Sequence, residues 1–84
     1  MKTKHSVSEQ VLRQTVAEFV FCDPAKLRKT DHFEDDLGLD SIDRIDLLTE
    51  VEKRHDVAFS DDEIVSIVDF GQLVTTLARK SDEE

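Results

Sequence analysis

The sequence contains few of the residues that disulfide-rich, membrane-spanning or aromatic-rich folds need. Its 84 residues include one Cys, one Pro and two Gly, and neither Trp nor Tyr. A single Cys excludes an internal disulfide, and we expect Cys22 to be a semi-buried, unreactive thiol after apolar Val20 and Phe21. No apolar run is long enough to span a bilayer. The basic N-terminus is not followed by an apolar signal-peptide segment, so we expect a cytoplasmic protein with no membrane insertion.

Positive charge is scarce in the middle of the chain. Residues 31–63 contain three Lys or Arg and thirteen Asp or Glu, a formal charge of −10 against −9 for the whole chain. A surface of this sign repels nucleic-acid phosphates instead of neutralising them. We therefore expect no nucleic-acid partner, but a protein partner with basic side chains that is steered in electrostatically.

Apolar residues at three- and four-residue spacing predict a first helix of about four turns. A capping box formed by Ser6 and Glu9 would begin it. It should end just before Asp23, because a residue that precedes Pro avoids helical backbone angles. Asp23 and Pro24 could then begin one short helical turn. The long irregular stretch that follows, up to Asp40, is of a kind that is often functional in a small domain.

A second helix is predicted to begin at Asp40 or Ser41, with an apolar face and a mostly acidic face. Arg44 and Glu52 fall within the apolar arc, where we expect their side chains to lie along its edge. Ile42 lies at the margin of that arc and should be partly exposed. The residues expected to form the apolar face are Ile42, Ile45, Leu47, Leu48 and Val51.

Two further helices are predicted in the last third of the chain. A second capping box, from Ser60 to Glu63, should open a short helix, and a similar pattern from Asp69 to Gln72 should open the last one. We expect residues 1–5 and 79–84 to be frayed tails. The residues alone therefore predict an all-α bundle of three or four helices with one long loop, in a single domain spanning residues 1–84.

Metal binding is not predicted. The acidic loop invites a calcium interpretation, but counting back from Gly38 puts Phe33 at the first position of the EF-hand pattern. His5, His32 and His55 have no Cys or carboxylate at a metal-ligand spacing. We expect solvated histidines and no metal site.

Ser41 is the one candidate for chemistry, but the residues around it do not form the pattern of a catalytic serine. The pattern Gly-x-Ser-x-Gly is absent, and Asp40 is the wrong kind of activator for a serine nucleophile. On these grounds Asp40 and Ser41 would merely cap the second helix, with Gly38 allowing a tight approach.

Residues 36–43, Asp-Leu-Gly-Leu-Asp-Ser-Ile-Asp, resemble the attachment motif of acyl carrier proteins, Asp-Leu-Gly-x-Asp-Ser-Leu. The resemblance extends from about Val7 to Leu77. It implies a four-helix bundle with a short third helix, in which Ser41 carries covalent 4′-phosphopantetheine, supported by Asp40 and Gly38. A separate phosphopantetheinyl transferase would attach this arm from coenzyme A. The protein, a discrete carrier and not an enzyme, would hold acyl groups as thioesters for fatty-acid or polyketide-type biosynthesis.

The same resemblance implies two surfaces. Partner enzymes with basic patches, which include the transferase and the acyl-loading and condensing enzymes, would dock on Asp40, Ile42, Asp43, Asp46 and Glu50. An acyl chain could retreat among helices lined by Ile45, Leu48, Val51, Phe59 and Ile67. We expect a monomer.

Some positions depart from the motif. Ile42 stands in place of the usual Leu, Phe59 and Ser60 stand in place of a common Ile-Pro pair, and Leu39 lies inside the motif. These features favour a carrier of a specialised pathway. The alternative is an acidic helical adaptor that no longer carries cargo.

Overall fold

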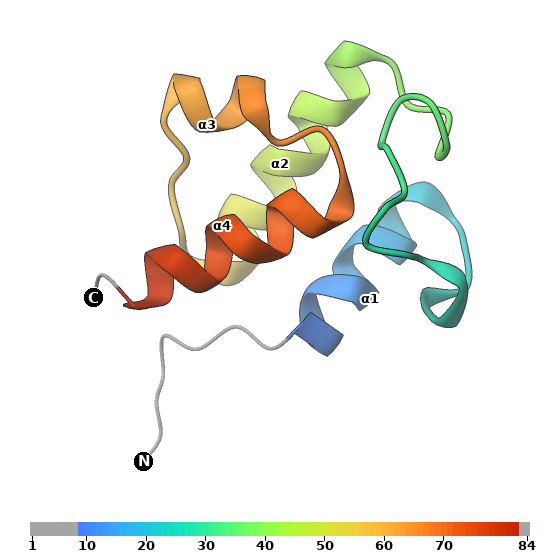
Figure 1. Cartoon of the computed structure of the whole chain (residues 1–84), viewed down its shortest axis with the longest axis horizontal. Coiled ribbons are helices and arrows are strands. Elements are labelled where there is room, and N and C mark those ends of the chain that lie inside the picture. Colours follow the sequence, from blue (N-terminus) through green and yellow to red (C-terminus); the bar gives the residue numbers. More distant parts are fainter. Residues whose placement is uncertain (1–8, 83–84) are drawn as a thin grey trace.

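The computed structural model describes the backbone of residues 9–82 as four α-helices around one apolar core (Figure 1). The all-α prediction, with a short third helix and a long loop after the first, is confirmed. No helix in the described part of the chain is long and apolar enough to cross a membrane. The predicted cap at Ser6 lies outside the described residues. In chain order the elements are α1 (Glu9–Val20), the 3-10 turn η1 (Pro24–Lys26), α2 (Ser41–His55), α3 (Asp61–Ser66) and α4 (Phe70–Asp82).

Local capping explains why three of these elements begin where they do. The Asp23 carboxylate accepts a hydrogen bond from the Ala25 N–H, and Pro24 opens η1. At α3 both bonds of the predicted capping box between Ser60 and Glu63 are present. The Asp69 carboxylate accepts from the Gln72 N–H at 2.7 Å and so caps α4.

The last helix is longer than the sequence indicated. We predicted a frayed tail from residue 79, but α4 continues to Asp82. Arg79 and Lys80 on this added turn reach across to Glu63 of α3, at 3.1 Å and 2.9 Å. These contacts join residues that are far apart in the sequence, so a local pattern could not reveal them.

The core is formed by buried apolar side chains from α1, α2 and α4 and from the connecting segments, and partly buried Ile64 of α3 packs against it. Val51 and Leu47 of α2 lie at its centre with exposed fractions of 0%. Ile45, which we predicted to face inward, is 44% exposed instead. At about 100° per residue it lies more than a quarter-turn from Val51, at the edge of the buried arc. The core cluster consists of Leu12, Val16, Leu27, Phe33, Leu47, Leu48, Val51, Phe59, Ile67, Phe70, Leu73 and Leu77.

The long loop before α2 is fastened to the segment that joins α3 and α4. Phe33 is fully buried, and its N–H donates to the Val68 carbonyl at 3.0 Å. The Gly71 N–H donates to the Lys29 carbonyl at 2.8 Å, and a Cβ on Gly71 would lie only 3.0 Å from that oxygen. Gly71 thus permits the close approach. The start of α2 is therefore held by the rest of the fold through this loop.

Candidate functional site

Ser41 is the first residue of α2, and its side chain is exposed. The cap is Asp40, whose backbone is extended and whose Oδ1 accepts from the Asp43 N–H at 2.8 Å. Within the described residues no hydrogen bond engages the Ser41 hydroxyl. The sequence predicted that Asp40 and Ser41 would together cap this helix, but only Asp40 does so. Asp40 satisfies the helix end, and the Ser41 hydroxyl remains available.

Gly38 supports this arrangement through its backbone angle. Its φ is +76°, in the region that residues with a side chain rarely adopt. We expected Gly38 to allow a tight approach, but a Cβ there would meet no atom within 4 Å. The requirement for Gly is therefore conformational. The adjacent Leu39 N–H then donates to the Phe33 carbonyl at 3.0 Å, which ties the turn to the buried loop anchor.

Arg44, one turn after Ser41, is a buried residue whose role the sequence did not reveal. It lies seven residues, about two full turns, before Val51 and so points in nearly the same direction as that core residue. Our expectation that it would lie along the edge of the arc is wrong, since it is only 8% exposed. The one available signal was a basic residue in the middle of an apolar arc.

The Arg44 guanidinium joins three segments beneath the site. It donates to the carbonyls of Ile64 at 2.5 Å and Ile67 at 3.0 Å, at the end of α3. It also donates to Glu34 of the loop at 3.3 Å. Carbonyls at a helix end have no partner within the helix, so Arg44 satisfies them and holds α3 against α2.

The predicted docking residues form an exposed acidic strip that begins beside Ser41. Ile42 is 68% exposed, which confirms that it lies at the margin of the apolar arc. Asp43 and Asp46 are exposed and have no ion-pair partner in the described part of the chain. Glu50 is half-buried and accepts from Arg54 at 2.7 Å. The strip thus combines an apolar side chain next to Ser41 with unpaired carboxylates further along α2.

The structure places four of the five predicted acyl-pocket residues in one cluster. Leu48, Val51, Phe59 and Ile67 are buried together in the core. The fifth, Ile45, is on the surface, as described above. The acyl pocket itself stays a prediction.

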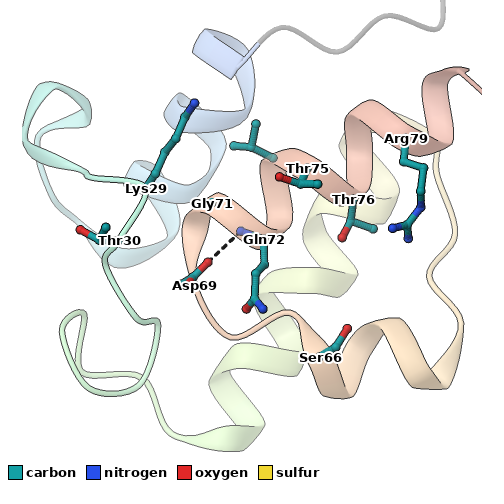
Figure 2. A pocket seen from close by; sticks show the side chains of 10 residues that line it. Lys29, Thr30, Ser66, Asp69, Gly71, Gln72, Thr75, Thr76 and Arg79 are labelled. Carbon is teal, nitrogen blue, oxygen red and sulfur yellow. Dashed lines mark hydrogen bonds between the residues drawn. The ribbon is translucent and has the colours of Figure 1, made fainter.

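Figure 2 shows a different hollow, of about 490 Å³, between the long loop, the end of α3 and α4. Most of the residues that line it have polar or charged side chains, and none of the five predicted acyl-pocket residues belongs to it. Its charged side chains are already engaged. Lys29 pairs with Glu9 at 3.2 Å, Arg79 pairs with Glu63, and Asp69 caps α4.

Other groups that could carry chemistry are poorly placed for it. Cys22 is half-buried. Its burial raises the pKa of the thiol, and the negative charge of nearby Asp23 raises it further, so the reactive thiolate is disfavoured. His55 is not simply solvated, since its Nε2 lies 3.1 Å from Thr15 Oγ1 and burial lowers its pKa. Within the described residues, no three His, Cys, Asp or Glu side chains gather in a way that could hold a metal ion.

Comparison with known proteins agrees with the motif. The family model described as "Phosphopantetheine attachment site" matches residues 10–77. A protein named acyl carrier protein from Caulobacter vibrioides is 33% identical over 70 residues, which cover 83% of this chain and 90% of that protein. An acyl carrier protein from Phenylobacterium zucineum is 35% identical over 63 residues, covering 75% of this chain and 80% of that protein. The chain belongs to the acyl carrier family, whose members bear a phosphopantetheine attachment site.

Proposed function

We propose that this protein carries acyl intermediates as thioesters on a 4′-phosphopantetheine arm attached to Ser41. One observation carries the assignment to this residue. Ser41 offers an exposed hydroxyl, without a hydrogen-bond partner among the described residues, at the first position of α2 and inside the segment that matches the family model. Asp40 and Gly38 support it as helix cap and as turn residue.

The start of α2 suits a phosphodiester. Backbone N–H groups at a helix N-terminus point outward, and the helix dipole favours negative charge there. The Asp40 carboxylate accepts from the Asp43 N–H, whereas in the described part of the chain the N–H groups of Ser41 and Ile42 donate to no acceptor. Both could donate to a phosphate oxygen. The neighbouring carboxylates oppose this attraction, but their exposure to water and salt screens the repulsion.

Attachment requires a separate enzyme, because no base among the described residues forms a hydrogen bond with the Ser41 hydroxyl. In the proposed step, a phosphopantetheinyl transferase directs the Ser41 oxygen to the phosphorus of coenzyme A that bears the pantetheine. A new P–O bond forms, the pyrophosphate bridge breaks, 3′,5′-ADP leaves, and the serine proton passes to the transferase. The arm would supply a terminal thiol, which would lose its proton and take the acyl group from an activated donor, provided by the loading enzyme, as the leaving group of that donor departs. Cys22, with its raised pKa, takes no part.

The acidic strip of α2 would select the partners. Its carboxylates attract enzymes with basic patches and orient them toward Ser41, whereas exposed rim charges add little to the final affinity. Asp43 and Asp46 are the groups best placed for this, since they are exposed and unpaired within the described residues. The partners are acyl-loading and condensing enzymes of fatty-acid or polyketide-type biosynthesis.

The assignment is tested by incubating the purified protein with coenzyme A and a broad-range phosphopantetheinyl transferase, and then recording its intact mass. We expect one phosphopantetheine adduct in the wild type and none in Ser41→Ala. Ser60→Ala is the matched control, because Ser60 is another exposed serine at the start of a helix. It should be modified as the wild type is. No adduct on the wild type, or an adduct that persists in Ser41→Ala, would overturn the proposal.

A further inference from the structure

Phe21, directly after α1, has a backbone conformation that does not suit its side chain. Its φ is 61°, in the left-handed region. The next residue, Cys22, donates its N–H to the Ala17 carbonyl at 3.0 Å. This is the Schellman arrangement of a helix end, in which the left-handed position is usually Gly.

No need of the fold explains Phe at this position. The other described residues with positive φ are Asp56 and Gly38, which belong to residue types that tolerate it. A side chain in the left-handed region brings Cβ close to a carbonyl oxygen. The Phe21 ring is also 94% exposed, so it gains almost nothing from burial. Strain and exposure together suggest a role outside folding.

The surface beside Phe21 is continuous with the acidic strip. A groove of about 330 Å³ lies next to the ring and is lined by residues of α1 and α2. Arg54 bridges it, with contacts of 2.8 Å to Glu18 and 2.7 Å to Glu50. Glu50 belongs both to this groove and to the predicted docking residues. Exposed Asp23 adds another negative charge two residues after Phe21.

We propose that Phe21 is an aromatic anchor for the enzymes that dock on the acidic strip to act on Ser41. The partner surface that fits is an apolar pocket flanked by Lys or Arg side chains. It matches an exposed ring beside Asp23 and beside the Glu18–Arg54–Glu50 cluster, in which two carboxylates outnumber one guanidinium. A second copy of this chain is a poor occupant, since each copy carries a net charge of −9. The inference rests on the proposed function and extends it to a second contact region.

Glu50, which lines the groove beside Phe21, lies close enough to Ser41 for one enzyme to contact both. Ser41 and Glu50 are nine residues apart on α2, or roughly 13 Å along its axis. A standard protein interface covers about 800 Å² on each partner, a patch roughly 30 Å across. Aromatic side chains at the centre of such patches often supply much of the binding energy.

The test is the substitution Phe21→Gly, assayed with the transferase at saturating coenzyme A. Because Gly relieves the left-handed strain, we expect the melting temperature to rise. Because the anchor is lost, we expect KM for the carrier to rise about tenfold or more, with kcat changed less than twofold. Phe21→Tyr, which keeps the ring, should stay within twofold of the wild type in KM. The matched control is Asp56→Gly, which replaces the left-handed residue at the end of α2 and removes no aromatic group.

Each contrary result has a distinct meaning. An adduct that forms on Phe21→Gly with an unchanged KM would overturn this inference and leave the proposed function intact. A lower melting temperature would show that the ring serves the fold, which also overturns it. Sedimentation showing a wild-type dimer that Phe21→Gly dissolves would assign the ring to self-association instead. A wild type that accepts no adduct would overturn both proposals.

Discussion

Replacing Arg44 with Gln should destabilise the protein far more than replacing an exposed arginine on the same helix. The two carbonyls of Ile64 and Ile67 at the end of α3 would lose a charged donor that Gln is too short to replace. A buried polar group left unsatisfied costs about 1–3 kcal/mol. The contact with half-exposed Glu34 adds little. We expect a loss of about 2–4 kcal/mol, which is large for a domain whose total stability is about 4–13 kcal/mol.

Thermal and urea unfolding measure this loss directly. At about 4–8 °C per kcal/mol for a domain of this size, the melting temperature should fall by roughly 8–32 °C. The matched control is Arg54→Gln, since Arg54 also lies on α2 and contacts two carboxylates, but it is exposed. Its loss should be clearly smaller, because exposed ion pairs contribute little. Equal losses in the two variants would refute the argument that burial makes Arg44 important.

Two further predictions concern single positions. The Ser60 N–H, then Lys80 and Arg79, lower the pKa of Glu63 to about 2 from its usual 4.5. Glu63→Gln should therefore cost about 1–2 kcal/mol at neutral pH, after allowance for partial exposure, and pH-dependent unfolding should show this difference shrinking as pH falls from about 4.5 toward 2. Gly38→Ala should cost about 1 kcal/mol in urea unfolding through backbone strain alone, because its Cβ would meet open space; a much larger loss would mean that the Cβ clashes.

Local signals predicted most of the helix boundaries. Caps at Asp23, Ser60 and Asp69 act within three residues of themselves, so their patterns are visible in the sequence. The extension of α4 was missed because it depends on pairing with Glu63, which is 16 residues or more away. Ile45 was misplaced because an arc drawn on a helix does not say how far neighbouring elements cover its edge.

At the candidate site, too, some residues were predicted from the sequence and others depend on contacts that the sequence does not show. The role of Ser41 was predicted from a family motif, and the structure adds that Asp40 alone serves as the cap. The role of Arg44 was not predicted, because no sequence pattern shows that the carbonyls at the end of α3 lie next to its guanidinium. The left-handed backbone of Phe21 was not predicted, because a sequence does not show the backbone angle at a helix end. The absence of Gly after the first helix was the one available signal.

The most direct test of the central claim is to locate the modification on the protein by fragmentation mass spectrometry after reaction with coenzyme A and the transferase. We expect a single phosphopantetheine on the fragment that contains Ser41, with every other serine unmodified. A modification found at Ser60 or Ser66, or a protein that stays unmodified, would contradict it.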